Sequence, residues 1–181
     1  MTGREDERMS DLDYRLMVFT MNLIDIFFSH IEKRVARFGI QPGMTIVDYG
    51  CGPGRYTIFY SRLAGRQGKV YAVDIHEMAI HLVREKIEKY GLDNVQPVLA
   101  KGYSSGLPDG IADVVTAIDI FFAIGDKKTF LAELKRIAKP NGMLIIDDGH
   151  QPRRATKEQI AAAGSWTIVE ETKDHLTCKP A

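Results

Sequence analysis

The stretch Thr45-Ile46-Val47-Asp48-Tyr49-Gly50-Cys51-Gly52-Pro53-Gly54-Arg55 decides the fold of this 181-residue chain. Its first four residues form a short apolar run that ends in a carboxylate, which predicts a buried strand over residues 45–48. Three glycines follow, and glycine permits a sharp turn and lets a ligand approach the backbone without a Cβ in the way. Pro53 suits the first turn of a helix, which we expect over residues 55–64. The stretch therefore predicts a strand, a tight loop that can hold a ligand, and a helix.

Strands and helices alternate along the rest of the chain. Apolar strands separated by helices indicate a parallel sheet with helices on both faces, and the last two strands are close enough to pair antiparallel. The predicted fold class is α/β: a Rossmann-like, doubly wound, mostly parallel seven-stranded sheet with an antiparallel last strand and an additional N-terminal helix. A capping box at residues 156–159 is expected to open a short helix. Further strands are expected at 69–74, 95–100, 113–118, 143–147, 166–171 and 175–179, and further helices at 77–90 and 127–138.

The N-terminal region is predicted to contain one long helix. Residues 1–10 carry charges of both signs and are expected to be a flexible lead-in rather than a signal peptide. A helix is expected over residues 11–38, with Ser10 or Asp11 as its N-cap. This helix is apolar around most of its circumference, which predicts contacts on more than one side and could form a homodimer surface. The predicted organisation is one domain, residues 11–181, in which the helix precedes a Rossmann-like core at 44–181.

The composition narrows the classes of partner and compartment. Lysine plus arginine equals aspartate plus glutamate at 24 each, so the chain has no overall positive charge for a nucleic-acid backbone, and we expect no such partner. Two cysteines make no disulfide framework, no spaced Cys/His cluster predicts a metal site, and a reduced, cytoplasmic setting is the default. No apolar run is long enough to predict a membrane span.

Two carboxylates at strand ends point to an adenosine-containing ligand. Ligands of doubly wound sheets bind outside the carboxyl ends of the strands, where the winding direction reverses. Asp48 can accept hydrogen bonds there from the loop or from an ammonium group. Asp74, at the end of the second strand, can accept hydrogen bonds from both ribose hydroxyls of an adenosine. Arg55 stands where a dinucleotide fingerprint needs its third glycine, which disfavours NAD or FAD but leaves the ligand open.

Residues 40–57 resemble motif I of class I S-adenosylmethionine (SAM)-dependent methyltransferases, most of all the type 11 group that includes the ubiquinone/menaquinone-biosynthesis methyltransferases. The resemblance continues through residues 68–74, 107–109, 113–115 and 134–142, so it covers about 40–148. It implies SAM as the cofactor and methyl transfer to an acceptor that we expect to be a small or apolar molecule. It also implies that the amino-acid part of SAM is held by Asp48 and by the backbone of Gly50, Cys51, Gly52 and Gly54.

The resemblance assigns the rest of the cofactor site residue by residue. It implies that Asp74 binds the ribose, that Ile75 lies against the adenine face, and that Asp119 stands near the methyl group. The adenine edge is bordered by residues 100–104, which include Gly102, Tyr103 and Ser104. Relatives often have an aspartate where this chain has Tyr103, so Ser104 or a backbone carbonyl is expected to take over that contact.

The sulfonium of SAM already activates the methyl group, so the protein has mainly to align the reactants. A general base could be supplied by Tyr56, Asp119, Asp148 or His150, although a solvated loop histidine is the favoured interpretation of the last. Asp147 and Asp148 are neighbours in a strand and are expected to point to opposite faces rather than form a carboxylate pair. For Tyr14 we favour core packing over contact with the cofactor.

The N-terminal helix could close over the acceptor, or it could be a dimer surface beside an open acceptor cleft. Two alternative functions remain at this point: a SAM-binding regulatory or scaffold subunit without catalysis, and a NAD-dependent oxidoreductase.

Overall fold

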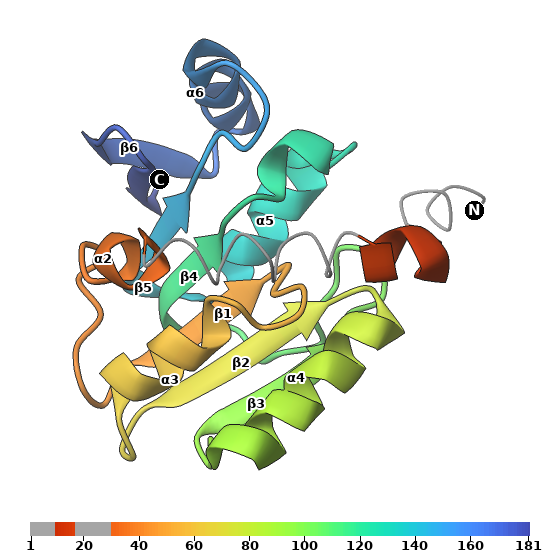
Figure 1. Ribbon diagram of the computed structural model, residues 1–181. Helices are drawn as coiled ribbons and strands as arrows, with labels where there is room; N and C mark the ends of the chain where they lie inside the picture. Colours follow the sequence, from red (N-terminus) through yellow and green to blue (C-terminus); the bar gives the residue numbers. More distant parts are fainter. Residues whose placement is uncertain (1–9, 17–29) are drawn as a thin grey trace.

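The computed structural model describes residues 10–16 and 30–181 and contains one seven-stranded sheet in the order β3-β2-β1-β4-β5-β7-β6 (Figure 1). Strands β1 to β5 run parallel, and β7 runs antiparallel to both of its neighbours, β5 and β6. The predicted fold class is therefore confirmed. The strands are β1 (Thr45–Tyr49), β2 (Lys69–Asp74), β3 (Val95–Leu99), β4 (Ala112–Ala117), β5 (Ala138–Ile146), β6 (Trp166–Glu171) and β7 (Leu176–Pro180).

Helices cover both faces of the sheet and bury a core on each. One core joins α2, α3 and α4 to residues such as Ile46, and the other joins α5 and α6 to residues such as Val47. These two neighbours face opposite sides because side chains alternate along a strand. The helices are α2 (His30–Val35), α3 (Thr57–Ala64), α4 (Glu77–Tyr90), the 3-10 turn η1 (Phe121–Ala123), α5 (Lys127–Ile137) and α6 (Arg153–Ala163).

The predicted N-terminal helix is described only at its two ends. Residues 11–16 are helical, and the Ser10 hydroxyl accepts the backbone N–H of Asp13 at 3.2 Å, as an N-cap does. At the other end α2 stops at Val35 and not at residue 38, because Phe38 N donates to the Val35 carbonyl in a tight turn. The lead-in at 1–9 and most of the apolar surface, at 17–29, lie outside the described residues.

Two local expectations are wrong. The Thr156 capping box does not open α6: the helix begins at Arg153, and Thr156 is buried inside it, where its hydroxyl accepts from Gln151 Nε2 at 2.9 Å. Strand β5 begins five residues earlier than predicted, because Ala138 already pairs with Ala112 before the register shifts. Within the described residues, no helix has the length and apolarity needed to cross a membrane.

Candidate cofactor and acceptor site

The glycine loop turns sharply at the carboxyl end of β1. The backbone N–H groups of Gly50 and Cys51 both donate to the Val73 carbonyl, at 2.7 and 3.0 Å, which fixes the loop to the end of β2. Gly50, Gly52 and Gly54 have φ values of 76°, 51° and 77°, in the left-handed region that glycine enters without strain. The loop therefore needs glycine for its backbone path.

Position 50 also requires glycine because the Ile120 side chain leaves no room for a Cβ there. A Cβ at this position would lie 2.5 Å from Ile120 Cδ1. We expect Gly50→Ala to lower the free energy of unfolding by the strain of a left-handed alanine, about 1–2 kcal/mol, plus about 1–3 kcal/mol for the overlap. Gly110→Ala is the matched control, since Gly110 has φ 63° and open space around its Cβ position. Equal losses in urea unfolding would contradict the role of the Ile120 contact.

Asp48 is a buried carboxylate that joins three elements. Its side chain accepts from Thr57 Oγ1 at 2.6 Å and from Thr116 Oγ1 at 3.2 Å, so it links β1 to α3 and β4. Burial raises the pKa of Asp48 to about 6, although both hydroxyl donors act to lower it. Asp48 thus holds the elements that surround the loop.

This raised pKa predicts a pH-dependent difference in stability between the wild type and Asp48→Asn. The folded wild type binds a proton more tightly than the unfolded chain, so its stability falls relative to the variant as the pH rises from about 4 to 6. The shift corresponds to a change on the order of 3 kcal/mol. Urea unfolding at pH 4, 5, 6 and 7 measures it, and a constant difference would contradict the prediction.

Asp113→Asn is the control, because its difference in stability from the wild type is expected to change with pH in the opposite direction. Burial raises the pKa of Asp113, but the Lys139 ammonium, the Thr45 N–H and the residue's own N–H outweigh burial, and the net pKa is lowered. The stabilising contribution of Asp113 is therefore present at neutral pH and is lost as the pH falls toward its folded pKa.

Asp74 connects the glycine loop to the end of β2. One of its oxygens accepts from Gly52 N and the other from His76 N, both at 2.9 Å. Burial raises its pKa, and these backbone donors oppose the rise. The Ile75 N–H also acts on this carboxylate, and its remaining lone-pair sites can accept from further donors.

The loop after β3 lies beside Asp74, because Ala100 N donates to the Asp74 carbonyl at 2.8 Å. Lys101 and Ser104 then close a tight turn through two backbone hydrogen bonds. The Tyr103 side chain points into the core, where its hydroxyl accepts from Asp126 N at 2.9 Å. Ser104 is exposed, so it stays the side chain predicted to contact adenine.

A second polar cluster lies at the ends of β4 and β5. Asp119 has a φ of 60°, unusual for a residue other than glycine, and its N–H donates to Asp147 Oδ1 at 2.9 Å. Asp147 is buried, and Arg34 Nη2 donates to its other oxygen at 2.6 Å. Arg34 Nη1 also donates to the Tyr56 hydroxyl at 2.8 Å. The structure therefore brings together two predicted candidates, Tyr56 and Asp119, around an arginine from α2.

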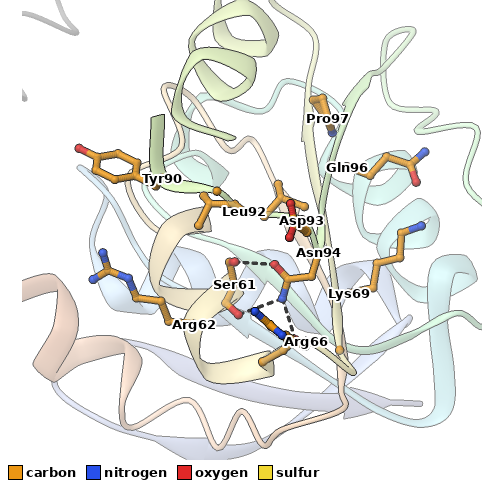
Figure 2. A pocket seen from close by; sticks show the side chains of 14 residues that line it. Ser61, Arg62, Arg66, Lys69, Tyr90, Leu92, Asp93, Asn94, Gln96 and Pro97 are labelled. Atoms are coloured by element: carbon orange, nitrogen blue, oxygen red, sulfur yellow. Dashed lines mark hydrogen bonds between the residues drawn. The ribbon is translucent and has the colours of Figure 1, made fainter. Parts of the chain in front are cut away.

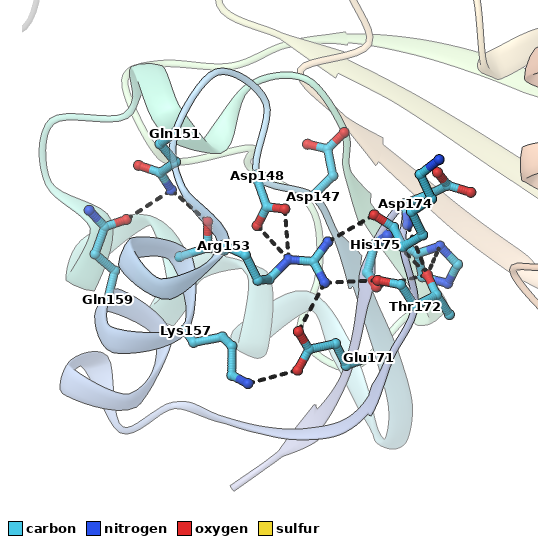
Figure 3. A network of polar contacts seen from close by, with 12 residues as sticks. Asp147, Asp148, Gln151, Arg153, Lys157, Gln159, Glu171, Thr172, Asp174 and His175 are labelled. Carbon is cyan, nitrogen blue, oxygen red and sulfur yellow. Dashed lines mark hydrogen bonds and ion pairs between the residues drawn. The ribbon is translucent and has the colours of Figure 1, made fainter.

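Asp147 and Asp148 point apart, as expected, and Figure 3 shows Asp148 in contact with Arg153. Asp148 accepts from Arg153 Nε at 2.6 and 2.8 Å, whereas Asp147 pairs with Arg34. Each arginine also donates to a backbone carbonyl of the turn between β6 and β7: Arg34 to residue 174, and Arg153 to residue 172, both at 2.8 Å. Asp148 is thus held in an ion pair that fixes this turn.

A family model described as a methyltransferase domain matches residues 40–177. The chain belongs to this family. A demethylmenaquinone methyltransferase from Geobacillus stearothermophilus is 30% identical over 135 residues, which are 73% of this chain and 58% of that protein. The ubiquinone/menaquinone biosynthesis C-methyltransferase of Escherichia coli is 33% identical over 115 residues, 63% of this chain and 46% of that protein. The chain thus spans about half the length of these relatives.

Solved structures agree with the assignment to class I SAM-dependent methyltransferases. A SAM-dependent methyltransferase from Aquifex aeolicus superposes with a TM-score of 0.75 at 30% identity, covering 82% of this chain and 88% of that one. A [4+2]-cyclase, SpnF, has the same fold at a TM-score of 0.68 and 18% identity, covering 78% of this chain and 57% of that one. The cyclase shows that a methyltransferase fold alone does not establish methyl transfer.

Two residues outside the matched region 40–177 contact residues of this site. Tyr14 is buried, as expected, but its ring stacks on His76 at 4.2 Å, and a Cβ on Gly52 would lie 3.8 Å from its hydroxyl. That hydroxyl has no hydrogen-bond partner among the described residues. A role for Arg34 in the site was not predicted from the sequence, because nothing in the local sequence distinguishes it from the other basic residues at the end of its helix.

The remaining candidates of the methyltransferase domain lie at the edges of the site. Ile75 packs beside the core, and the exposed His150 lies against Phe122, with ring centroids 4.8 Å apart. Cys51 and Cys178 are both buried and free. Across the described ranges 10–16 and 30–181, no group of three His, Cys, Asp or Glu side chains could hold a metal ion.

Proposed function

We propose that this methyltransferase domain binds SAM at the carboxyl ends of β1 and β2 and transfers its methyl group to a small or apolar acceptor. The observation that carries the proposal is the contact between Asp74 and Gly52 N, which joins the glycine loop and the ribose-binding acid in one site. The residues fit the cofactor, because the Asp74 carboxylate keeps lone-pair sites that can accept from ribose hydroxyls. The Tyr14 hydroxyl over Gly52 offers one more polar contact.

SAM, when bound, supplies an activated methyl group. The chain then has to hold the cofactor and orient the acceptor. In this proposal the loop backbone at residues 50–54 holds the amino-acid part of SAM, and Asp74 binds the ribose. The turn at residues 101–104 contacts the edge of the adenine through Ser104.

Tyr56 faces the acceptor as a hydrogen-bond donor. Burial raises its pKa to about 12, although Arg34 acts to lower it, so the phenol stays protonated at neutral pH. Because its oxygen already accepts from Arg34, its proton is left to orient an acceptor atom. Asp119, on the other side of Arg34, is the proposed proton acceptor.

The proposed chemical class of the methyl acceptor is inferred from the names of the related proteins. Two of them are named for demethylmenaquinone methylation and for ubiquinone/menaquinone biosynthesis, which supports a small or apolar acceptor for this chain. Ile120 and Phe122, both partly buried, lie next to the Asp119 cluster and supply apolar surface there.

Calorimetry with SAM, S-adenosylhomocysteine and NAD tests cofactor choice. We expect both adenosyl sulfur compounds to bind and NAD not to bind. Methyl transfer is then measured with tritiated SAM and a panel of short-chain quinols, phenols and amines. Binding without transfer would favour a regulatory or scaffold subunit, and NAD binding without SAM binding would reject the proposal.

A further inference from the structure

A hollow of about 990 Å³ lies at the edge of the sheet away from the glycine loop (Figure 2). It is formed by the ends of α3 and α4 and by the beginnings of β2 and β3. Lys69 begins β2 in the hollow and Asp74 ends the same strand in the cofactor site. Five residues of strand separate them by roughly 17 Å, so the hollow is distinct from the cofactor site.

Positive charge gathers around the hollow. Arg62, Arg66 and Lys69 line it together with a single carboxylate, Asp93. In the view of Figure 2, Arg62 lies on one side with Tyr90, and Lys69 lies on the other with Gln96. None of the three cations forms an ion pair or a side-chain hydrogen bond with another residue of the described ranges, unlike Arg34 and Arg153, which pair with Asp147 and Asp148.

The helix ends that border the hollow do not account for these cations. Asn94 Nδ2 donates to the carbonyls of Ser61 and Gly65, at 2.9 and 2.8 Å, and so caps α3. The end of α4 is capped by Gly91, whose N–H donates to the Ile87 carbonyl. Side-chain and backbone amides thus cap these helix ends, and the exposed guanidinium and ammonium groups are free to bind an anion.

Two of the cations lie near aromatic rings. The Arg62 guanidinium carbon lies 5.9 Å from the centre of the Phe59 ring, and Lys69 Nζ lies 5.0 Å from that of Tyr71. Cation–π contacts of this kind limit the freedom of the side chains before a ligand arrives. Arginine's planar fork matches phosphate oxygens in pairs, and lysine adds a point charge.

We propose that this hollow binds a ligand that carries two or more phosphate groups. The three cations offset part of the negative charge of such a ligand, and Gln96 adds a hydrogen-bonding amide. The phosphates can belong to a bare polyphosphate or to a nucleotide. The exposed ring of Tyr90 on the rim would stack on the base of a nucleotide but would add nothing for a bare polyphosphate.

The full chain is titrated with tripolyphosphate and, separately, with ATP in a calorimeter at low and at physiological salt. We expect R62Q/R66Q/K69Q to weaken tripolyphosphate binding at least about 30-fold. The matched control is R84Q/K128Q/K173Q, which removes three exposed charges elsewhere and is expected to change the affinity less than about twofold. Thermal unfolding of both variants verifies that they are folded.

Absence of tripolyphosphate binding to the wild type, or equal losses in the two triple variants, would overturn the proposal. It is also overturned if tripolyphosphate competes with S-adenosylhomocysteine, because the phosphates would then occupy the cofactor site. Tighter binding of ATP that Tyr90→Ala removes identifies a nucleotide, and equal binding of both probes identifies a bare polyphosphate. Both results support a phosphate site, and neither depends on methyl transfer.

Discussion

Asp74→Ala is expected to weaken the binding of SAM and S-adenosylhomocysteine by about two to four powers of ten. The variant removes two charge-assisted hydrogen bonds to the ribose, each contributing about 1.5–3 kcal/mol. The total of about 3–6 kcal/mol converts to this range at 1.36 kcal/mol per tenfold change. Calorimetry measures the loss, and Asp109→Ala, which removes an exposed carboxylate paired with Arg136 near the end of α5, is expected to leave affinity unchanged.

The Asp74 side chain also holds Gly52 N and His76 N, so part of the loss could come from the loop. A ligand change separates the two causes. The wild type is expected to prefer S-adenosylhomocysteine over its 2′,3′-dideoxy analogue, and Asp74→Ala is expected to bind both equally weakly. If the variant keeps the preference, or if its affinity is unchanged, Asp74 does not bind the ribose.

The parts of the site that were predictable from sequence depend on local physics. A run such as residues 45–48 is largely apolar because both faces of its strand are covered. The loop contains glycines because its backbone has positive φ angles that other residues avoid. Asp74 was predictable because strand length alone places it at the sheet edge. The parallel arrangement of β1 to β5 follows from the alternation of strands and helices along the chain.

The missed parts depend on contacts between distant residues. Arg34 acts through Asp147 and the carbonyl of residue 174, which lie 113 and 140 residues away in the chain. The capping box at Thr156 failed for the same reason. Arg153 is tied to Asp148 and to the turn after β6, so the helix begins at Arg153, three residues before Thr156, and the threonine hydroxyl is buried inside it.

Arg34→Met is expected to lower the free energy of unfolding by about 3–5 kcal/mol at neutral pH, because it leaves Asp147 as a buried carboxylate without its cation. The Asp147 side chain is 6% exposed, and burial, with the nearby Asp119, already raises its pKa to about 6. Without Arg34 this pKa rises further, so the folded variant binds a proton that the unfolded chain releases. Its stability therefore falls as the pH rises toward 8, and the deficit shrinks at pH 5.

Two further variants separate the buried charge from the loss of the arginine itself. R34M/D147L removes both charges and is expected to recover most of the lost stability, since an apolar pair can replace a buried ion pair at little cost. Arg37→Met removes an arginine one turn further along whose side chain is 65% exposed and whose pair with Asp174 spans 3.2 Å, so it should cost less than about 1 kcal/mol. Urea unfolding at pH 5 and pH 8 measures all three variants. If Arg34→Met and Arg37→Met cost the same, or if the double variant is no more stable than Arg34→Met, Arg34 does not compensate the charge of Asp147, and the polar cluster at the ends of β4 and β5 must be held together by its other contacts.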